Sequence, residues 1–186
     1  MGRVCIFFAE GFEETEALTV VDLLRRAGIE TDMVSVTGSR EVTGSHQVTI
    51  QMDRLFDEVD FKETGMLILP GGMPGTKNLE EYTPLMDQLD AFYHEGKYIC
   101  AICAAPRILG HRGMLKGKKA CSFPDFESHL EGAHVTKHPV ETAENIITGR
   151  GMGCSVDFGL AIVEQLKGKE AAKVLAERVV YSHYKG

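Results

Sequence analysis

The feature of this chain that most constrains its fold is a regular alternation of short apolar runs with longer stretches of helical periodicity. Continuous apolar runs such as Val4–Phe8 and Met66–Leu69 are typical of strands that are buried on both faces. The first amphipathic stretch predicts a helix over Glu14–Ala27, which Gly28 ends. Strands that alternate with helices in this way predict an α/β fold, with a mostly parallel sheet and helices on both faces.

The same patterns predict the remaining elements along the chain. Further strands are expected at Thr31–Val36, Tyr98–Ile102, Ala120–Ser122 and, as one or two strands, within Ala133–Thr148. A hairpin is expected over Gly38–Gln51, and further helices at Thr83–Glu95, Ala105–Gly110, Ser155–Leu166 and Glu170–Val180. No repeat or linker interrupts the pattern, so we expect residues 1–186 to form one domain.

Composition and charge exclude several classes of protein. The chain has 20 basic and 27 acidic side chains, a net charge of −7, and shows no basic stripe, which argues against a nucleic-acid partner. No apolar run is long enough to predict a membrane span. The five cysteines are an odd number in a chain large enough to need no disulfides, and the N-terminus resembles no export signal. We therefore expect a cytoplasmic protein with reduced thiols.

In a parallel sheet, ligands bind at the carboxyl ends of the strands, so the loops that follow Phe8, Leu69, Ile102 and Thr148 are the candidate site segments. The first loop carries four carboxylates near a helix N-terminus. Glu10, Glu13 and Glu14 are interpreted as acidic side chains that favour the helix dipole. Glu16 is expected on the helix face that turns toward the sheet, where burial would raise its pKa and allow it to donate a proton.

Two of the loops are rich in glycine. Gly71 and Gly72 follow Leu69 directly, and their N–H groups could bind an oxyanion, although a simple tight turn explains the pair equally well. Gly149-Arg-Gly-Met-Gly153 resembles a dinucleotide-binding fingerprint, but its spacing is different and no strand with an acidic residue follows. We expect no nucleotide cofactor, and interpret Gly71 and Arg150 as the rim of a pocket.

The third loop gives the strongest signal. Cys103 stands at a strand-to-helix turn between Ala101 and the pair Ala104-Ala105, and small neighbours are what a sharp nucleophile elbow needs. Pro106 suits the first turn of the helix that follows. The positive end of that helix is expected to lower the pKa of the thiol. Cys103 is therefore the candidate nucleophile rather than a packing residue.

Cys100 and Cys103 also form a Cys-x-x-Cys motif. Since side chains alternate along a strand, we expect Cys100 to face the opposite side of the sheet from Cys103, which disfavours a redox disulfide. No second cysteine pair or His-Glu-x-x-His motif accompanies them, so we expect no metal. The histidines are interpreted as surface residues.

Taken together, the motifs resemble the ThiJ/PfpI superfamily, and most closely its bacterial ThiJ-like subgroup. The resemblance runs from about Val4 to Leu166 and rests on Glu16, Leu69-Pro-Gly-Gly72, Ala101-Ile-Cys-Ala-Ala-Pro106 and Thr148-Gly-Arg-Gly151. It implies a flavodoxin-like three-layer sandwich and a homodimer. It also implies that Cys103 is the reactive thiol, that Glu16 hydrogen-bonds to it, and that the N–H groups of Gly72 and Ala104 form an oxyanion site.

The chain departs from the superfamily at two positions. The protease-like members have a histidine directly after the nucleophile, where this chain has Ala104, which disfavours proteolysis. Other members have a histidine where this chain has Phe123, and His138-Pro-Val-Glu141 departs from the motif of the amidotransferases.

Two functions are consistent with these residues. The first is a glyoxalase- or deglycase-like enzyme for small reactive carbonyls, in which Cys103 is the nucleophile and Glu16 shuttles the proton. The alternative is a redox-responsive stress protein or chaperone whose Cys103 is oxidised to a sulfinate.

Overall fold

The computed structural model describes residues 2–184 of the chain. Its centre is a seven-stranded sheet in which all neighbouring strands are parallel except one antiparallel pair at an edge. In spatial order the strands are β10 (Val140–Ala143), β11 (Ile146–Gly149), β7 (Tyr98–Ile102), β6 (Thr64–Leu69), β1 (Arg3–Phe8), β2 (Thr31–Ser35) and β5 (Arg54–Leu55). The prediction of a mostly parallel sheet is confirmed.

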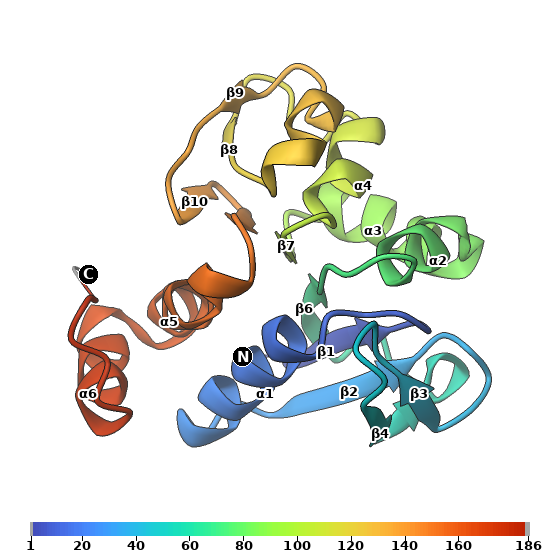
Figure 1. Ribbon diagram of the computed structural model, residues 1–186, viewed down its shortest axis with the longest axis horizontal. Helices are drawn as coiled ribbons and strands as arrows, with labels where there is room; N and C mark the ends of the chain where they lie inside the picture. The colour runs from blue at the N-terminus through green and yellow to red at the C-terminus, as the bar shows by residue number, and fades with distance from the viewer. Residues whose placement is uncertain (1, 185–186) are drawn as a thin grey trace.

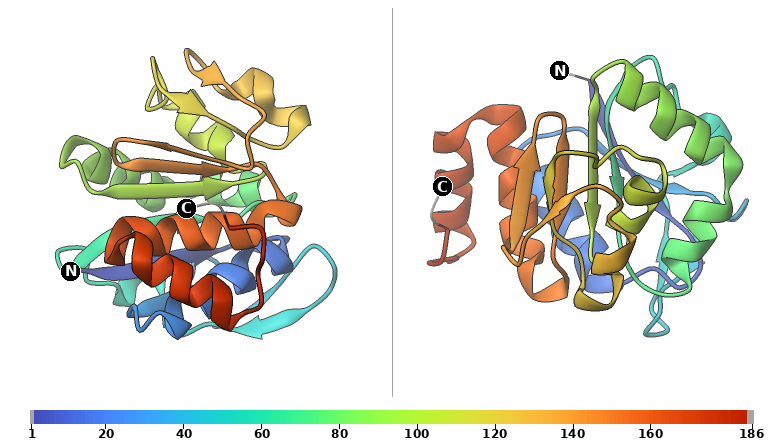
Figure 2. Two further views of the ribbon diagram at one scale, coloured as in Figure 1. Left: turned by 90° about the vertical axis from the view of Figure 1, so that its left-hand side faces the viewer. Right: turned by 90° about the horizontal axis from the view of Figure 1, so that it is seen from above.

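Helices cover both faces of this sheet, as Figures 1 and 2 show. One apolar core packs between the sheet and the helices α1, α5 and α6, and a second core packs between the sheet and α2, α3 and α4. Alternate residues of β1 enter the two cores, Ile6 the first and Phe7 the second, which is why this strand is apolar throughout. The helices are α1 (Glu14–Arg26), α2 (Gly75–Glu81), α3 (Thr83–His94), α4 (Pro106–His111), α5 (Ser155–Lys167) and α6 (Lys169–Arg178).

Smaller elements lie outside the main sheet. The predicted hairpin is present as the antiparallel pair β3 (Glu41–Thr43) and β4 (Thr49–Gln51). The short strand predicted at Ala120–Ser122 is β8 (Lys119–Ala120), which pairs with β9 (His134–Val135). Three short 3₁₀ helices complete the description: η1 (Phe56–Glu58), η2 (Pro124–His129) and η3 (Met152–Cys154).

The order of the strands places one crevice at the carboxyl edge of the sheet. From β1 the chain goes first to β2 on one side, and later to β6, β7 and β11 on the other, so the direction of winding changes between β1 and β6. Loops leave the sheet in opposite directions at such a point and leave room for a ligand. Ala101 pairs with Leu69 on one side and Thr148 on the other, so β6, β7 and β11 end side by side.

No helix within residues 2–184 has both the length and the apolar character needed to cross a membrane.

Candidate functional site

Cys103 stands between β7 and α4, at the carboxyl edge of the sheet. Its φ of 64° is in the left-handed region, which residues other than glycine rarely adopt, so the chain turns sharply at this residue. The turn is held on both sides: the Cys103 N–H donates to the carbonyl of Gly149 at 3.0 Å, and the Cys103 carbonyl accepts from the N–H of Phe123 at 2.9 Å. The side chain is partly exposed. Strained turns of this kind place a nucleophile at the surface of an α/β sheet.

The expectation that Cys100 and Cys103 face opposite sides of the sheet is wrong. Cys100 belongs to the core that packs against α1, and Cys103 contacts that same core. Strict alternation ends at Ile102, and the left-handed turn swings the next side chain back toward α1. Both cysteines are free thiols.

Glu16 reaches Cys103 from the first turn of α1, as the position of its side chain on the helix predicts. The helix begins where the Glu13 carboxylate accepts the N–H of Glu16 at 2.6 Å, an N-cap that fixes the first turn. The Glu16 side chain is fully buried. Its Oε2 accepts the N–H of Gly71 at 2.9 Å, while Oε1 has no hydrogen-bond partner among the described residues. The carboxyl and the Cys103 thiol lie close enough for each to affect the pKa of the other.

The Gly71-Gly72 loop closes over this pair. A Cβ on Gly71 would lie 2.5 Å from Glu16 Oε2 and 3.1 Å from Cys103 Sγ, so only glycine leaves room for the two side chains to meet. Gly72 has a φ of 91° and packs against the backbone of Glu13. The N–H groups of Gly72 and Ala104 face the sulfur and act to lower the pKa of the thiol.

The pKa values of the pair follow from its burial. Removal from water raises the pKa of Glu16 to about 7, and the charge of Glu13 adds to this, although hydrogen bonds from Cys103 and Gly71 oppose it. Burial also raises the pKa of Cys103, and the neighbouring Glu16 charge raises it further. The expected lowering by the helix is therefore outweighed. When Glu16 holds a proton, its repulsion of the thiolate disappears and the two N–H groups stabilise the sulfur charge.

Glu14 has a role that the sequence analysis missed. It is buried, and instead of only favouring the dipole of α1 it accepts hydrogen bonds from the β3–β4 turn: the His46 N–H at 2.7 Å and His46 Nδ1 at 3.0 Å. Gly44 in this turn leaves space for the Glu14 carboxyl, since a Cβ there would lie 2.3 Å from it. The glycine in the hairpin was the available signal, but nothing local pairs it with Glu14.

One group of side chains has the spacing of metal ligands. Glu13, Glu14 and His46 place one oxygen or nitrogen atom each within 4.8 Å of one another. The Glu14 oxygens already accept hydrogen bonds from His46, and Glu13 caps α1. These hydrogen bonds account for the grouping as the anchor of the hairpin on α1.

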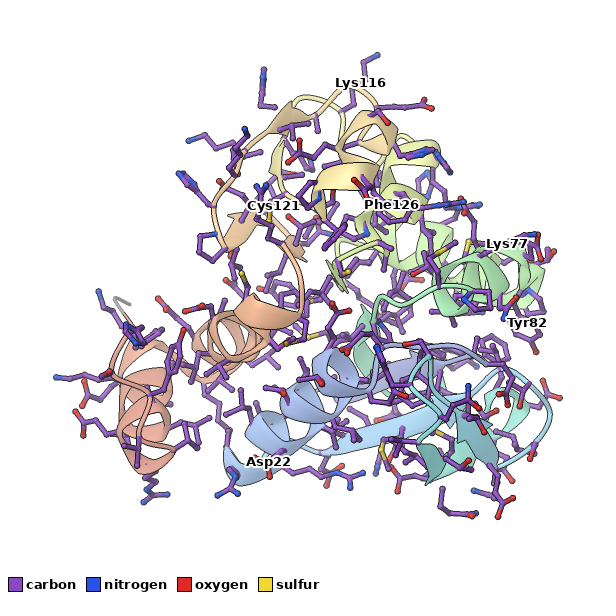
Figure 3. All side chains as sticks on the ribbon, in the orientation of Figure 1. Asp22, Lys77, Tyr82, Lys116, Cys121 and Phe126 are labelled. Carbon is purple, nitrogen blue, oxygen red and sulfur yellow. The ribbon has the colours of Figure 1, made fainter. Side chains whose placement is uncertain are left out.

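Gly71 and Arg150 were expected at the rim of the site, and three other residues lie near them. Arg150 Nη2 lies 3.2 Å from Glu127 Oε1, so the predicted rim cation pairs with a carboxylate of η2, the segment on which Figure 3 labels Phe126. Phe123 has its ring against Gly151, with Cδ2 3.5 Å from the position of a Cβ there. Phe123, Met73 and Met152 are all exposed. The signal for the two methionines was their place directly after strand-end glycines.

Comparison with known proteins identifies the family. Residues 2–165 match the family model described as DJ-1/PfpI family. Glutathione-independent glyoxalase DJ-1 from Schizosaccharomyces pombe is 33% identical over 181 residues, covering 91% of this chain and 94% of that protein. The structure titled Toxoplasma gondii DJ-1, oxidized, superposes with a TM-score of 0.93 at 32% identity and covers 98% of this chain and 100% of that one. The flavodoxin-like α/β fold expected from the sequence is confirmed by this match.

Protein DJ-1 homolog B from Arabidopsis thaliana is 35% identical over 176 residues, which are 94% of this chain but 40% of the plant protein. The chain therefore spans less than half the length of that relative. The resemblance to ThiJ/PfpI proteins is confirmed at the level of the family, whereas the bacterial subgroup stays a prediction. With the family model covering residues 2–165 and relatives matching along most of the chain, this protein belongs to the DJ-1/PfpI family.

Proposed function

We propose that this protein is a cysteine-dependent enzyme that acts on small reactive carbonyls, with Cys103 as nucleophile and Glu16 as proton shuttle. The observation that carries the proposal is that a buried carboxyl and a partly exposed thiol approach the same point, the Cβ position of Gly71, to 2.5 Å and 3.1 Å. Burial raises the pKa of this carboxyl to about 7. The N–H groups of Gly72 and Ala104 lie beside the same sulfur. Together these groups supply a nucleophile, a proton and donors for an oxyanion.

The first step is addition of Cys103 to an aldehyde, in which the thiol proton passes to the Glu16 carboxylate as the sulfur attacks. A sulfur–carbon bond forms between Cys103 and the carbonyl carbon, the π electrons of the C=O bond move to oxygen, and the Glu16 proton converts this oxygen to a hydroxyl. The Gly72 and Ala104 N–H groups stabilise the charge on the oxygen as it develops. The product is a hemithioacetal and a Glu16 carboxylate.

A 2-oxoaldehyde can then complete a glyoxalase reaction. The Glu16 carboxylate removes the proton from the hemithioacetal carbon and returns it to the neighbouring carbon, while the hydroxyl proton moves to the oxygen of the neighbouring carbonyl, which gives a thioester of a 2-hydroxyacid. Water cleaves the thioester and releases Cys103. Methylglyoxal and one water thus give lactic acid, with one carbon oxidised and its neighbour reduced, and no external oxidant is needed. The name of the fission-yeast relative, a glutathione-independent glyoxalase, supports this assignment.

The experiment is lactate production from methylglyoxal by the wild-type protein and by the variants Cys103→Ala and Glu16→Gln. We expect Cys103→Ala to abolish turnover and Glu16→Gln to lower kcat by about 100-fold or more, in line with the loss of general acid–base catalysis. Cys5→Ala is the matched control, because Cys5 is a buried free thiol in the other core. Lactate formation that survives Cys103→Ala would refute the proposal.

A second candidate function has its own supporting observation. Oε1 of Glu16 is buried without a hydrogen-bond partner among the described residues, so a protonated Glu16 could donate to an oxygen on an oxidised Cys103. Cys103 would then be a redox sensor whose sulfinate is stabilised. Intact-mass spectrometry after graded peroxide tests this: preferential gain of two oxygens on Cys103 supports it, and equal oxidation of Cys154, the other partly exposed thiol, contradicts it.

The remaining parts of the proposal concern context. We infer a homodimer of single-domain chains that acts in the cytoplasm on a small aldehyde, without a nucleic-acid or membrane partner and without a metal or other cofactor. The net charge of −7 supports the absence of a nucleic-acid partner, and the five free cysteines support a reducing compartment.

A further inference from the structure

Three of the loops that surround Cys103 each present a large apolar side chain to solvent. Met73 is 44% exposed, Phe123 is 41% exposed and Met152 is 55% exposed. Within residues 2–184, the other large apolar side chains with comparable exposure are all valines: Val48, Val135, Val174 and Val180. The bulky and flexible apolar groups of the surface are therefore found at the candidate site.

Each of the three is anchored close to the reacting thiol. Met73 follows Gly72, whose N–H faces the Cys103 sulfur. Phe123 donates its N–H to the Cys103 carbonyl at 2.9 Å. Met152 follows Gly151, and the Phe123 ring lies against that glycine, 3.5 Å from the position of a Cβ. The three residues thus belong to the loops after β6 and β11 and to the segment before η2, at the edge of the sheet where Cys103 stands.

The charged residue of the rim is partly paired. Arg150 Nη2 pairs with Glu127, and Arg150 Nη1 is buried without a hydrogen-bond partner among the described residues. Small-molecule sites typically combine an apolar lining with a few polar groups that fix orientation. Here Glu16 and the two N–H groups are the polar part, and methionine side chains adapt to the shape of an apolar ligand.

We propose that Met73, Phe123 and Met152 form an apolar rim that selects carbonyl substrates with an apolar substituent, such as aryl 2-oxoaldehydes, over small hydrophilic ones. The preference among substrates rests on the proposed function, whereas the binding of an apolar group beside Cys103 does not. Each 60 Å² of apolar substituent surface that the rim covers favours binding by about tenfold. Phenylglyoxal should therefore have a lower KM than methylglyoxal, because its phenyl group contacts the rim more extensively than a methyl group does.

The binding part is tested without turnover. We would measure the rates at which N-benzylmaleimide and N-methylmaleimide modify Cys103, each divided by its rate with a free model thiol, by peptide mass spectrometry. The wild-type protein should favour the benzyl reagent by about tenfold. In the triple variant Met73→Ser, Phe123→Ser, Met152→Ser, this preference should fall to about one. Phe123→Leu, which keeps an apolar side chain, should retain most of it.

Val174→Ser is the matched control, because Val174 is an exposed apolar residue on α6 and should leave the preference unchanged. Circular dichroism verifies that each variant is folded. An equal preference in the wild-type protein and the triple variant overturns the apolar rim. A preference that depends on the rim, in a protein that makes no lactate and no mandelate, supports the rim and overturns the proposed function.

Discussion

Gly71 is the residue whose replacement tests the geometry of the pair most simply. Its φ is not in the left-handed region, so alanine is compatible with its backbone, and the effect of Gly71→Ala comes from the Cβ alone. That atom would lie 2.6 Å from Cys103 Cβ and 2.5 Å from Glu16 Oε2. We predict a loss of about 1–3 kcal/mol in the free energy of unfolding. A displacement near 1 Å at the pair should also slow lactate production by about 100-fold.

The matched control for this prediction is Gly153→Ala. Gly153 lies in η3, which follows β11 at the same edge of the sheet, and a Cβ there meets no atom within 4 Å. This variant should keep wild-type stability and rate, as chemical denaturation and the lactate assay would measure. Equal effects of the two substitutions would contradict the close approach of Gly71 to the pair.

Glu16 gives a second prediction for a single residue, which concerns how the free energy of unfolding changes with pH. Its pKa is raised from 4.5 to about 7 in the folded protein, so the folded state binds this proton more tightly than the unfolded chain does. The stability associated with the proton is complete below pH 4.5 and is lost as pH rises through 7. Between these limits the wild-type protein should lose roughly 3 kcal/mol relative to Glu16→Gln.

Urea unfolding of both proteins at pH 5 and pH 8 measures this difference. If the difference in the free energy of unfolding between the wild-type protein and Glu16→Gln is the same at both pH values, Glu16 titrates as an exposed carboxyl does and the prediction is wrong.

The sequence predicted which residues lie together at the candidate site better than it predicted the orientation of their side chains. Cys103 was recognisable because small residues and Pro106 surround it, and Glu16 because of its position on a helix face. The orientation of Cys100 relative to Cys103 was predicted wrongly, because strand alternation holds only while φ stays extended and Cys103 has a φ of 64°. The left-handed backbone of Cys103 is held by its hydrogen bonds with Gly149 and Phe123. Both partners are distant from Cys103 in the sequence, so no local pattern predicts this conformation.

Among the elements, the β3–β4 hairpin depends on one buried carboxylate from α1. Hydrogen bonds from His46 and Val48 lower the pKa of Glu14 even though burial acts to raise it, so the carboxylate is charged when it holds the turn. We predict that Glu14→Ala destabilises the protein by about 1–3 kcal/mol. It should also increase hydrogen exchange at the β3–β4 amides.

Glu10→Ala is the control for the hairpin prediction. Glu10 is an exposed carboxylate of the same loop, and among the described residues its side chain accepts one hydrogen bond, from the Thr43 N–H at 3.2 Å. Hydrogen exchange followed by mass spectrometry compares the two variants. An unchanged hairpin in Glu14→Ala would show that β3 and β4 hold each other without α1.

Elements with strong periodicity were predictable, and short ones were not. The strands β1, β6 and β7 and the helices α1, α3 and α5 agree with their predicted ranges to within about two residues. Helix α2 was missed because it is short and begins at Gly75, directly after Pro74. The two-residue strand β5 was also missed, since its pairing with β2 comes from tertiary contact rather than from a local pattern.

For the whole molecule, the change of winding direction between β1 and β6 explains why the site lies where it does. The loop after β1 leads to Glu16, the loop after β6 supplies Gly71 and Gly72, and β7 leads to Cys103. The sequence predicted that these loops would share one edge of the sheet, because parallel strands require it. It could not predict the apolar rim, because the exposure of Met73 or Phe123 is a property of the folded surface.

The proposed homodimer is a prediction at this scale. Sedimentation equilibrium over a range of protein concentrations should give twice the chain mass of 20.5 kDa. The chain mass at every concentration would contradict the dimer, without affecting the reaction proposed for one chain.

The reactivity of Cys103 against pH tests the central claim, that Cys103 and Glu16 act as one unit. The Glu16 carboxyl should lose its proton with a pKa near 7, and the carboxylate can then accept the thiol proton as Cys103 reacts. Site-resolved mass spectrometry with limiting iodoacetamide should show Cys103 reacting before the other four cysteines. Its rate should rise to a plateau above pH 7 in the wild-type protein and show no inflection near 7 in Glu16→Gln. The same pH profile in both proteins, or faster reaction of another cysteine, would contradict the account.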